Sequence, residues 1–74
     1  MITKKILVDW VMKHNCVIEP LPEINNAPLA AIRFRNPRTG RRAYINPPID
    51  DTDTTFEIVS RVCVSLGIPI HPDA

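Results

Sequence analysis

The sequence predicts an α+β domain in which two helices pack on one face of a three-stranded antiparallel sheet, in the order α-β-β-β-α. Three observations predict it: a helical apolar pattern near each end of the chain, two alternating segments joined by a strong turn signal, and a short apolar segment before them. Hydrophobic residues make up 45% of the chain and charged residues 23%, which is ordinary globular usage. We therefore expect residues 1–74 to form a single domain with one core.

The first helix is expected to begin after Thr3, whose hydroxyl is a suitable N-cap. Its buried stripe follows the i, i+3, i+4 spacing of one helix face and consists of Ile6, Leu7, Trp10, Val11 and His14. Asn15 is expected to end the helix, because Asn tolerates the left-handed backbone conformation common at helix ends. Trp10, as the largest apolar side chain, is expected to anchor the core.

The first strand is expected over residues 16–21, where Pro20 and the following Pro22 cannot donate to a ladder, so it should lie at an edge or stop early. Residues 23–28 have loop composition. In the segment of residues 29–35, alternation begins at Ala30, and it resumes over residues 41–45; the Asn-Pro and Gly of residues 36–40 predict a hairpin turn between them. In this hairpin the residues expected to face inward are Ile32, Phe34, Ala43 and Ile45, and those expected to face outward are Arg33, Arg35, Arg42 and Tyr44.

The second helix is predicted after the strand-stopping Pro47-Pro48 pair and a connector over residues 49–53. The Thr54-Thr55-Phe56-Glu57 segment matches a capping box with Thr54 as the N-cap. The predicted buried stripe consists of Phe56, Val59, Val62, Cys63 and Leu66. Gly67 is placed to end the helix, and residues 68–74 are expected to be an irregular tail.

Charge is unevenly distributed, although the net charge is only +1. Between residues 33 and 42 there are five arginines and no acid, and between residues 50 and 57 there are four acids and no base. Guanidinium groups bind phosphate in bidentate geometry and stack on bases, and the ring of Tyr44 offers a further stacking surface. The residues predicted to bind nucleic acid are Arg33, Arg35, Arg38, Arg41, Arg42 and Tyr44.

Two other interpretations of this arginine-rich face remain open. It could be a protein-interaction or dimerisation surface, for example of a regulatory partner in a small operon, or a solvated face whose charge is satisfied by Glu19 or Glu23. The acidic run, Asp50, Asp51 and Asp53, could then receive the arginines of a second copy. Helix-start electrostatics also explains this run, which lacks the ligand spacing of a calcium loop.

No cofactor or metal site is expected. His14, Cys16, Cys63 and His71 lack zinc-site spacing, and the chain has no phosphate-binding Gly-rich loop. Two cysteines are too few for a disulfide scaffold, and neither a signal peptide nor a membrane span is evident. The sequence therefore predicts a cytoplasmic location, with no membrane partner and no small-molecule substrate.

The segment Ile32-Arg33-Phe34-Arg35 is followed by a turn and a basic pair in residues 36–42, NPRTGRR. Together with the element order over nearly the whole chain, this hairpin resembles the double-stranded-RNA-binding-like fold of the HicA toxin family. That family carries ribonuclease activity on a histidine of the second strand. Here Ala30-Ala31-Ile32 occupies the matching neighbourhood, Asn26-Ala27-Pro28 stands where the family has a preceding Gly, and no histidine lies between residues 15 and 70. The resemblance thus implies the fold, but not RNA cleavage.

These observations favour a noncatalytic nucleic-acid-binding module, for RNA rather than DNA, that uses the arginine-rich hairpin face. A third hypothesis, a ribonuclease that works through His14 or His71, ranks behind binding and protein association, because no catalytic constellation is visible.

Overall fold

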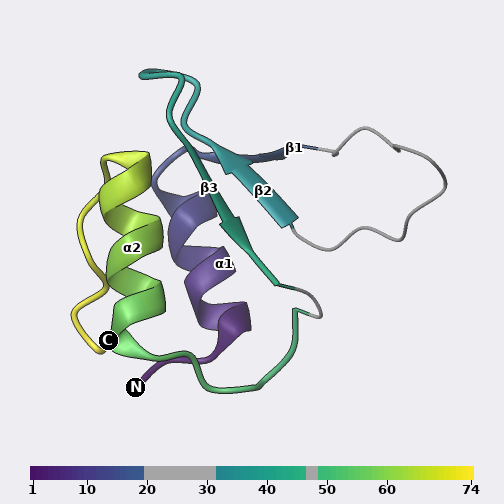
Figure 1. Ribbon diagram of the computed structural model, residues 1–74, viewed down its shortest axis with the longest axis vertical. Coiled ribbons are helices and arrows are strands. Elements are labelled where there is room, and N and C mark those ends of the chain that lie inside the picture. Colours follow the sequence, from purple (N-terminus) through teal and green to yellow (C-terminus); the bar gives the residue numbers. More distant parts are fainter. Residues whose placement is uncertain (20–31, 47–48) are drawn as a thin grey trace, which may run out of the picture.

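The computed structural model describes residues 1–19, 32–46 and 49–74 and confirms the predicted α+β fold (Figure 1). Two helices and three strands follow one another in the predicted order: α1 (Lys4–Lys13), β1 (Val17–Glu19), β2 (Ile32–Arg35), β3 (Arg42–Ile45) and α2 (Phe56–Leu66). The expected loop at residues 23–28, the Pro47-Pro48 stop and the outer parts of the first two strands, residues 20–21 and 29–31, lie outside the described residues.

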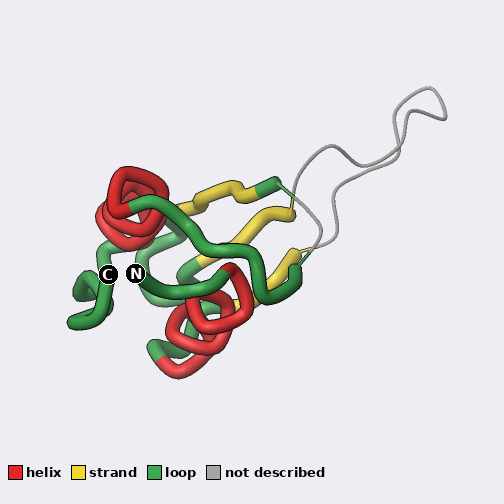
Figure 2. Tube along the Cα trace, turned by 90° about the horizontal axis from the view of Figure 1, so that it is seen from below, coloured by secondary structure: helices red, strands yellow, loops and turns green. Residues whose placement is uncertain are grey.

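The three strands form an antiparallel sheet in the order β1-β2-β3, so β1 lies at an edge as predicted. The register of β2 and β3 confirms the predicted inward face of the hairpin, because Ile32 lies opposite Ile45 and Phe34 lies opposite Ala43. Phe34 is fully buried and is the largest of the fully buried side chains in the described part of the chain. The two helices lie on the same side of the sheet (Figures 1 and 2), and the core fills the space between these layers.

The hairpin turn is built around Asn36, whose backbone carbonyl accepts hydrogen bonds from Thr39 N at 3.2 Å and Gly40 N at 2.7 Å. Gly40 has a φ of 74°, a left-handed conformation that glycine adopts without steric cost. Asn36 itself is only 5% exposed. Its side-chain amide donates to the carbonyl of Leu66 at 2.8 Å, so the turn is bonded to the end of α2.

Both predicted ends of α1 are confirmed. The hydroxyl of Thr3 accepts a hydrogen bond from Ile6 N at 3.1 Å, and Asn15 takes a φ of 65°. The predicted stripe is too wide, however, because Ile6 is 41% exposed while Leu7 and Val11 are fully buried.

Trp10 does not anchor the core; it is half-buried and packs at the core margin. Its indole N–H needs a partner and donates to the carbonyl of Pro69 at 2.7 Å. The ring contacts two histidine rings, with centroid distances of 4.4 Å to His14 and 4.7 Å to His71. Trp10 therefore connects α1 to the C-terminal tail.

The start of α2 differs from the prediction by one residue. Thr54 is buried, and its hydroxyl donates to the carbonyl of Ile2 at 3.0 Å, so it ties down the N-terminal segment. Thr55 is the N-cap instead, with its hydroxyl accepting from Ile58 N at 3.2 Å. Phe56 then occupies the first helical position and is 58% exposed, so it does not join the buried stripe. Gly67 ends the helix with a φ of 72°, as predicted.

The acidic segment lies beside the start of α1, not only beside α2. The backbone carbonyls of Thr52 and Asp50 accept hydrogen bonds from Lys4 N at 2.9 Å and Lys5 N at 3.1 Å. These amides belong to the first turn of α1, where backbone donors lack partners within the helix. The connector before α2 thus holds the N-terminal end of α1.

Candidate functional site

Four of the six predicted binding residues share the outer face of the sheet, opposite the helices. Arg33 lies across from Tyr44, and Arg35 lies across from Arg42. On the other side of β2, Glu19 of β1 lies across from Arg33. Directly opposed residues of an antiparallel pair point to the same face, so register alone gathers these side chains.

The three arginines converge on the carboxylate of Glu19. Arg42 Nε lies 3.2 Å from Glu19 Oε1, Arg35 Nε lies 3.2 Å from Oε2, and Arg33 Nε lies 3.5 Å from Oε1. We call these four residues the arginine–glutamate cluster. Glu19 reaches across β2 to Arg42 on the far strand, so one acid contacts cations on both other strands. With three cations and one anion, the cluster carries a net charge of +2.

Glu19 therefore makes the contacts with the arginines of this face that one of the sequence interpretations expected. Glu23, the other acid named in that interpretation, lies outside the described residues. Without Glu19, Arg35 and Arg42 would be like charges directly opposed across a strand pair, which is destabilising. One carboxylate nevertheless leaves two positive charges on the face. The side chains of Arg35 and Arg42 are 34% and 50% exposed, so both remain accessible to solvent.

The electrostatics of Glu19 follow from these contacts. Desolvation acts to raise the pKa of Glu19, but the hydrogen bond from Arg42 and the charges of the three arginines outweigh it. The pKa of this carboxyl group is consequently lower than its ordinary value. Glu19 is therefore ionised at neutral pH and acts as an anion held by guanidinium groups.

Tyr44 extends this surface beside the cluster. It is 44% exposed and sits opposite Arg33 on the outer face. The backbone carbonyl of Tyr44 accepts a hydrogen bond from Arg61 Nη2 of α2 at 3.0 Å. This bond ties β3 to α2, and the phenol ring is held on a strand of the sheet rather than on a loop.

Arg41 and Arg38 do not join this face. Arg41 Nη1 donates to the carbonyl of Val64 at 3.4 Å, and its side chain runs alongside Gly67. It thereby supplies a cation at the C-terminal end of α2, where the helix dipole favours one. Four of the six predicted residues thus share the outer face, and Arg38 and Arg41 lie elsewhere.

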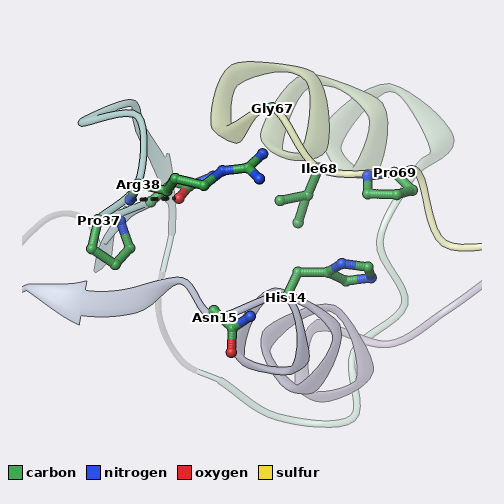
Figure 3. Close-up of a pocket in the computed structure, with 8 residues that line it drawn as sticks. His14, Asn15, Pro37, Arg38, Gly67, Ile68 and Pro69 are labelled. Atoms are coloured by element: carbon green, nitrogen blue, oxygen red, sulfur yellow. Dashed lines mark hydrogen bonds between the residues drawn. The ribbon is translucent and has the colours of Figure 1, made fainter.

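Arg38 lies beside a hollow of about 260 Å³ between the C-terminal ends of the two helices and the hairpin (Figure 3). The hollow is lined by His14, Asn15, Asn36, Pro37, Arg38, Gly67, Ile68 and Pro69. Both polar atoms of the Asn36 side chain already have partners: Nδ2 donates to Leu66 O, and Oδ1 accepts from Arg38 N at 3.1 Å. The hollow is thus lined by one arginine, whereas three arginines meet at the arginine–glutamate cluster.

Two residues important to the site were missed by sequence reasoning. Asn36 was identified as a turn former, but its bond to Leu66, thirty residues away, has no local signal. Arg61 lies on the exposed side of α2 and gives no sequence indication that it bonds the carbonyl of Tyr44. Both residues hold the hairpin against α2 and thus determine how the outer face is presented.

The pKa shifts of the titratable groups outside the cluster have local causes. Hydrogen bonding from Thr52, with a further contribution from the charge of Lys4, lowers the pKa of Asp50. Burial raises the pKa of both free thiols, Cys16 and Cys63. Within residues 1–19, 32–46 and 49–74, no three His, Cys, Asp or Glu side chains are grouped as metal ligands would be. Whether the acidic run receives a second copy of the chain stays a prediction.

Compared with known proteins, the chain matches no family model, no curated protein and no solved structure. The resemblance to the HicA family is therefore an expectation that these comparisons leave untested. In the described part of the chain, no helix has the length and apolar character needed to cross a membrane.

Proposed function

We propose that this domain is a noncatalytic nucleic-acid-binding module whose outer sheet face contacts the sugar-phosphate backbone. The observation that supports the proposal is the convergence of Arg33, Arg35 and Arg42 on a single carboxylate, with Tyr44 exposed beside them. A phosphodiester carries one negative charge shared by two oxygens, as a carboxylate does, and guanidinium groups recognise both. Tyr44 adds a ring on which an unpaired base can stack.

RNA is the proposed ligand ahead of DNA, on the strength of the resemblance to a double-stranded-RNA-binding-like fold. A cytoplasmic location belongs to the same proposal. It is supported by Cys16 and Cys63, which are both free, as is usual for thiols in a reducing compartment.

The test is to measure binding of labelled single-stranded and duplex RNA and DNA by fluorescence anisotropy over a range of salt concentrations. Affinity should fall steeply as salt rises, because bound cations release counterions from the phosphates. In the Arg35→Ala/Arg42→Ala double variant, the slope of log K against log salt should become shallower by roughly 1.4–1.8, at 0.7–0.9 per lost phosphate contact.

The matched control is Lys5→Ala/Lys13→Ala, which removes the same charge from exposed positions of α1 in the other layer. This control should change the slope much less than the arginine variant. Equal losses in the two variants would show that overall charge, not the outer face, binds the ligand. Absence of binding to every nucleic acid, together with a dimer mass in light scattering, would replace the proposal with protein association.

A further inference from the structure

Glu19 occupies the position that an anionic ligand of the outer face would need. Its two carboxylate oxygens are shared among three guanidinium groups, at 3.2 Å from Arg35 and Arg42 and 3.5 Å from Arg33. Each of these contacts is made through Nε, an inner nitrogen of the guanidinium fork. A phosphate that reaches the same three nitrogens must therefore take the place of the carboxylate.

The position of Glu19 allows such an exchange. It is the last described residue of β1, the edge strand, and its side chain is 22% exposed. Among the described residues its partners are the three arginines, and no further bond holds the carboxylate over the sheet. Partly exposed ion pairs are individually weak, and a side chain with several rotatable bonds can move away without disturbing the strand.

The Glu19 carboxylate keeps the three arginine side chains together in the free protein. Arg35 and Arg42 are directly opposed across β2 and β3 and would repel each other without an anion between them. Glu19 holds the guanidinium groups around one anion position in the free protein. The geometry that a phosphate requires is thus already present before binding, which lowers the cost of ordering the arginines.

From these contacts we infer that Glu19 is a built-in competitor of the nucleic-acid phosphate. Its carboxylate occupies the phosphate position between Arg33, Arg35 and Arg42 in the free protein and is displaced when the ligand binds. This inference rests on the proposed function and assigns Glu19 as the residue that sets its affinity. Displacement is an exchange of one anion for another, so no covalent step or cofactor is involved.

The test compares Glu19→Gln with the wild-type protein, using a short labelled single-stranded RNA of mixed sequence at low and at moderate salt. Gln keeps the size of the side chain but cannot compete as an anion. The variant should bind about three- to tenfold more tightly, the size expected when partly exposed ion pairs no longer oppose binding. The matched control is Asp9→Asn, which makes the same charge change at an exposed position of α1 and should have a much smaller effect.

The outcomes separate this inference from the proposed function. If wild-type binding depends on Arg35 and Arg42 but Glu19→Gln binds no more tightly, the proposed function stands and the inference is wrong. If Asp9→Asn tightens binding as much as Glu19→Gln, a general charge effect replaces the inference. If neither the wild-type protein nor Glu19→Gln binds any RNA or DNA, both proposals fail. Binding by Glu19→Gln where the wild type shows none would support the inference in its strongest form.

A second measurement needs no variant and covers the case in which Glu19→Gln does not fold. The side-chain carboxyl ¹³C resonance of Glu19 is followed by NMR while the same RNA is added to the wild-type protein. Displacement predicts a shift of this resonance toward that of a carboxylate in solvent, together with changes at the Nε–H groups of Arg35 and Arg42. An unchanged Glu19 resonance at saturating RNA would overturn the inference.

Discussion

At the scale of single residues, Asn36 links the hairpin turn to the end of α2 through its side chain. Its amide nitrogen donates to Leu66 O at the end of α2, and its amide oxygen accepts from Arg38 N within the turn. Its backbone N–H donates to Arg41 O at 2.8 Å, one residue before β3 begins. A buried polar group with this many partners is costly to remove, because each abandoned donor or acceptor loses its hydrogen bond.

The first prediction is that Asn36→Ala lowers the free energy of unfolding by about 1–3 kcal/mol, the cost of leaving buried polar groups without partners. Equilibrium urea denaturation followed by circular dichroism measures this difference. The matched control is Asn46→Ala, at an exposed position after β3, where a change within about 0.5 kcal/mol is expected. Similar losses in the two variants would contradict the role assigned to the Leu66 bond.

At the scale of secondary-structure elements, a tertiary hydrogen bond decides which residue caps the start of α2, whereas a local glycine ends the helix. Thr54 and Thr55 are chemically equivalent candidates for the N-cap, and the bond from Thr54 to Ile2 O leaves the capping role to Thr55. The C-terminal end needs no such choice, because Gly67 is the one glycine near it and takes a φ of 72°. Arg41 then contacts the same helix end from the hairpin.

The second prediction concerns this helix end. A Cβ added at Gly67 would meet only ordinary contacts, at 3.5 Å and 3.7 Å from side-chain atoms of Arg41. Gly67→Ala should therefore cost about 1 kcal/mol through the left-handed backbone alone. Urea denaturation checks the value, with Ser65→Ala on the same helix as a control that should be neutral or slightly stabilising, since Ala favours helix. A Gly67→Ala variant as stable as the wild type would mean that the helix ends differently.

At the scale of the whole molecule, acidic pH should weaken the ion pairs that link the three strands. Glu19 bonds to arginines of both other strands, and its pKa is lower in the folded chain than its ordinary value of about 4.3. A group with a lowered folded-state pKa stabilises the fold above its unfolded pKa, and that contribution is lost as pH falls through the folded value. Asp50, whose pKa is also lowered, acts in the same direction at the connector.

The third prediction compares the melting temperatures of the wild-type protein and Glu19→Gln from neutral pH down to about pH 2.5, below the ordinary carboxyl range. The wild type should melt at the higher temperature near neutrality. The gap should close as pH falls below about 4, because a protonated Glu19 has the charge of Gln. Asp50 is common to both proteins, so its titration does not alter the gap. A gap that stays constant across the acid range would contradict the ionised cluster.

Much of the fold could be predicted from the sequence because its signals are local. Alternation over residues 32–35 and 42–45 predicted which side chains face inward, and the Thr3 cap and the Gly67 ending depend on neighbouring residues in the chain. The candidate site was predicted in part. Period-two alternation placed Arg33, Arg35 and Arg42 on one face, but it carried no information on how far Glu19 reaches across β2.

The sequence by itself thus determined the element order, the two faces of the hairpin and the residues that begin α1 and end α2. The tertiary structure alone decided that Glu19 gathers three arginines, that Arg41 turns to the end of α2, and that Trp10 lies at the core margin with its N–H bonded to Pro69. The physical reason is distance along the chain. Backbone preference and side-chain period act over a few residues, whereas ion pairs and buried hydrogen bonds join residues that meet only when the layers pack.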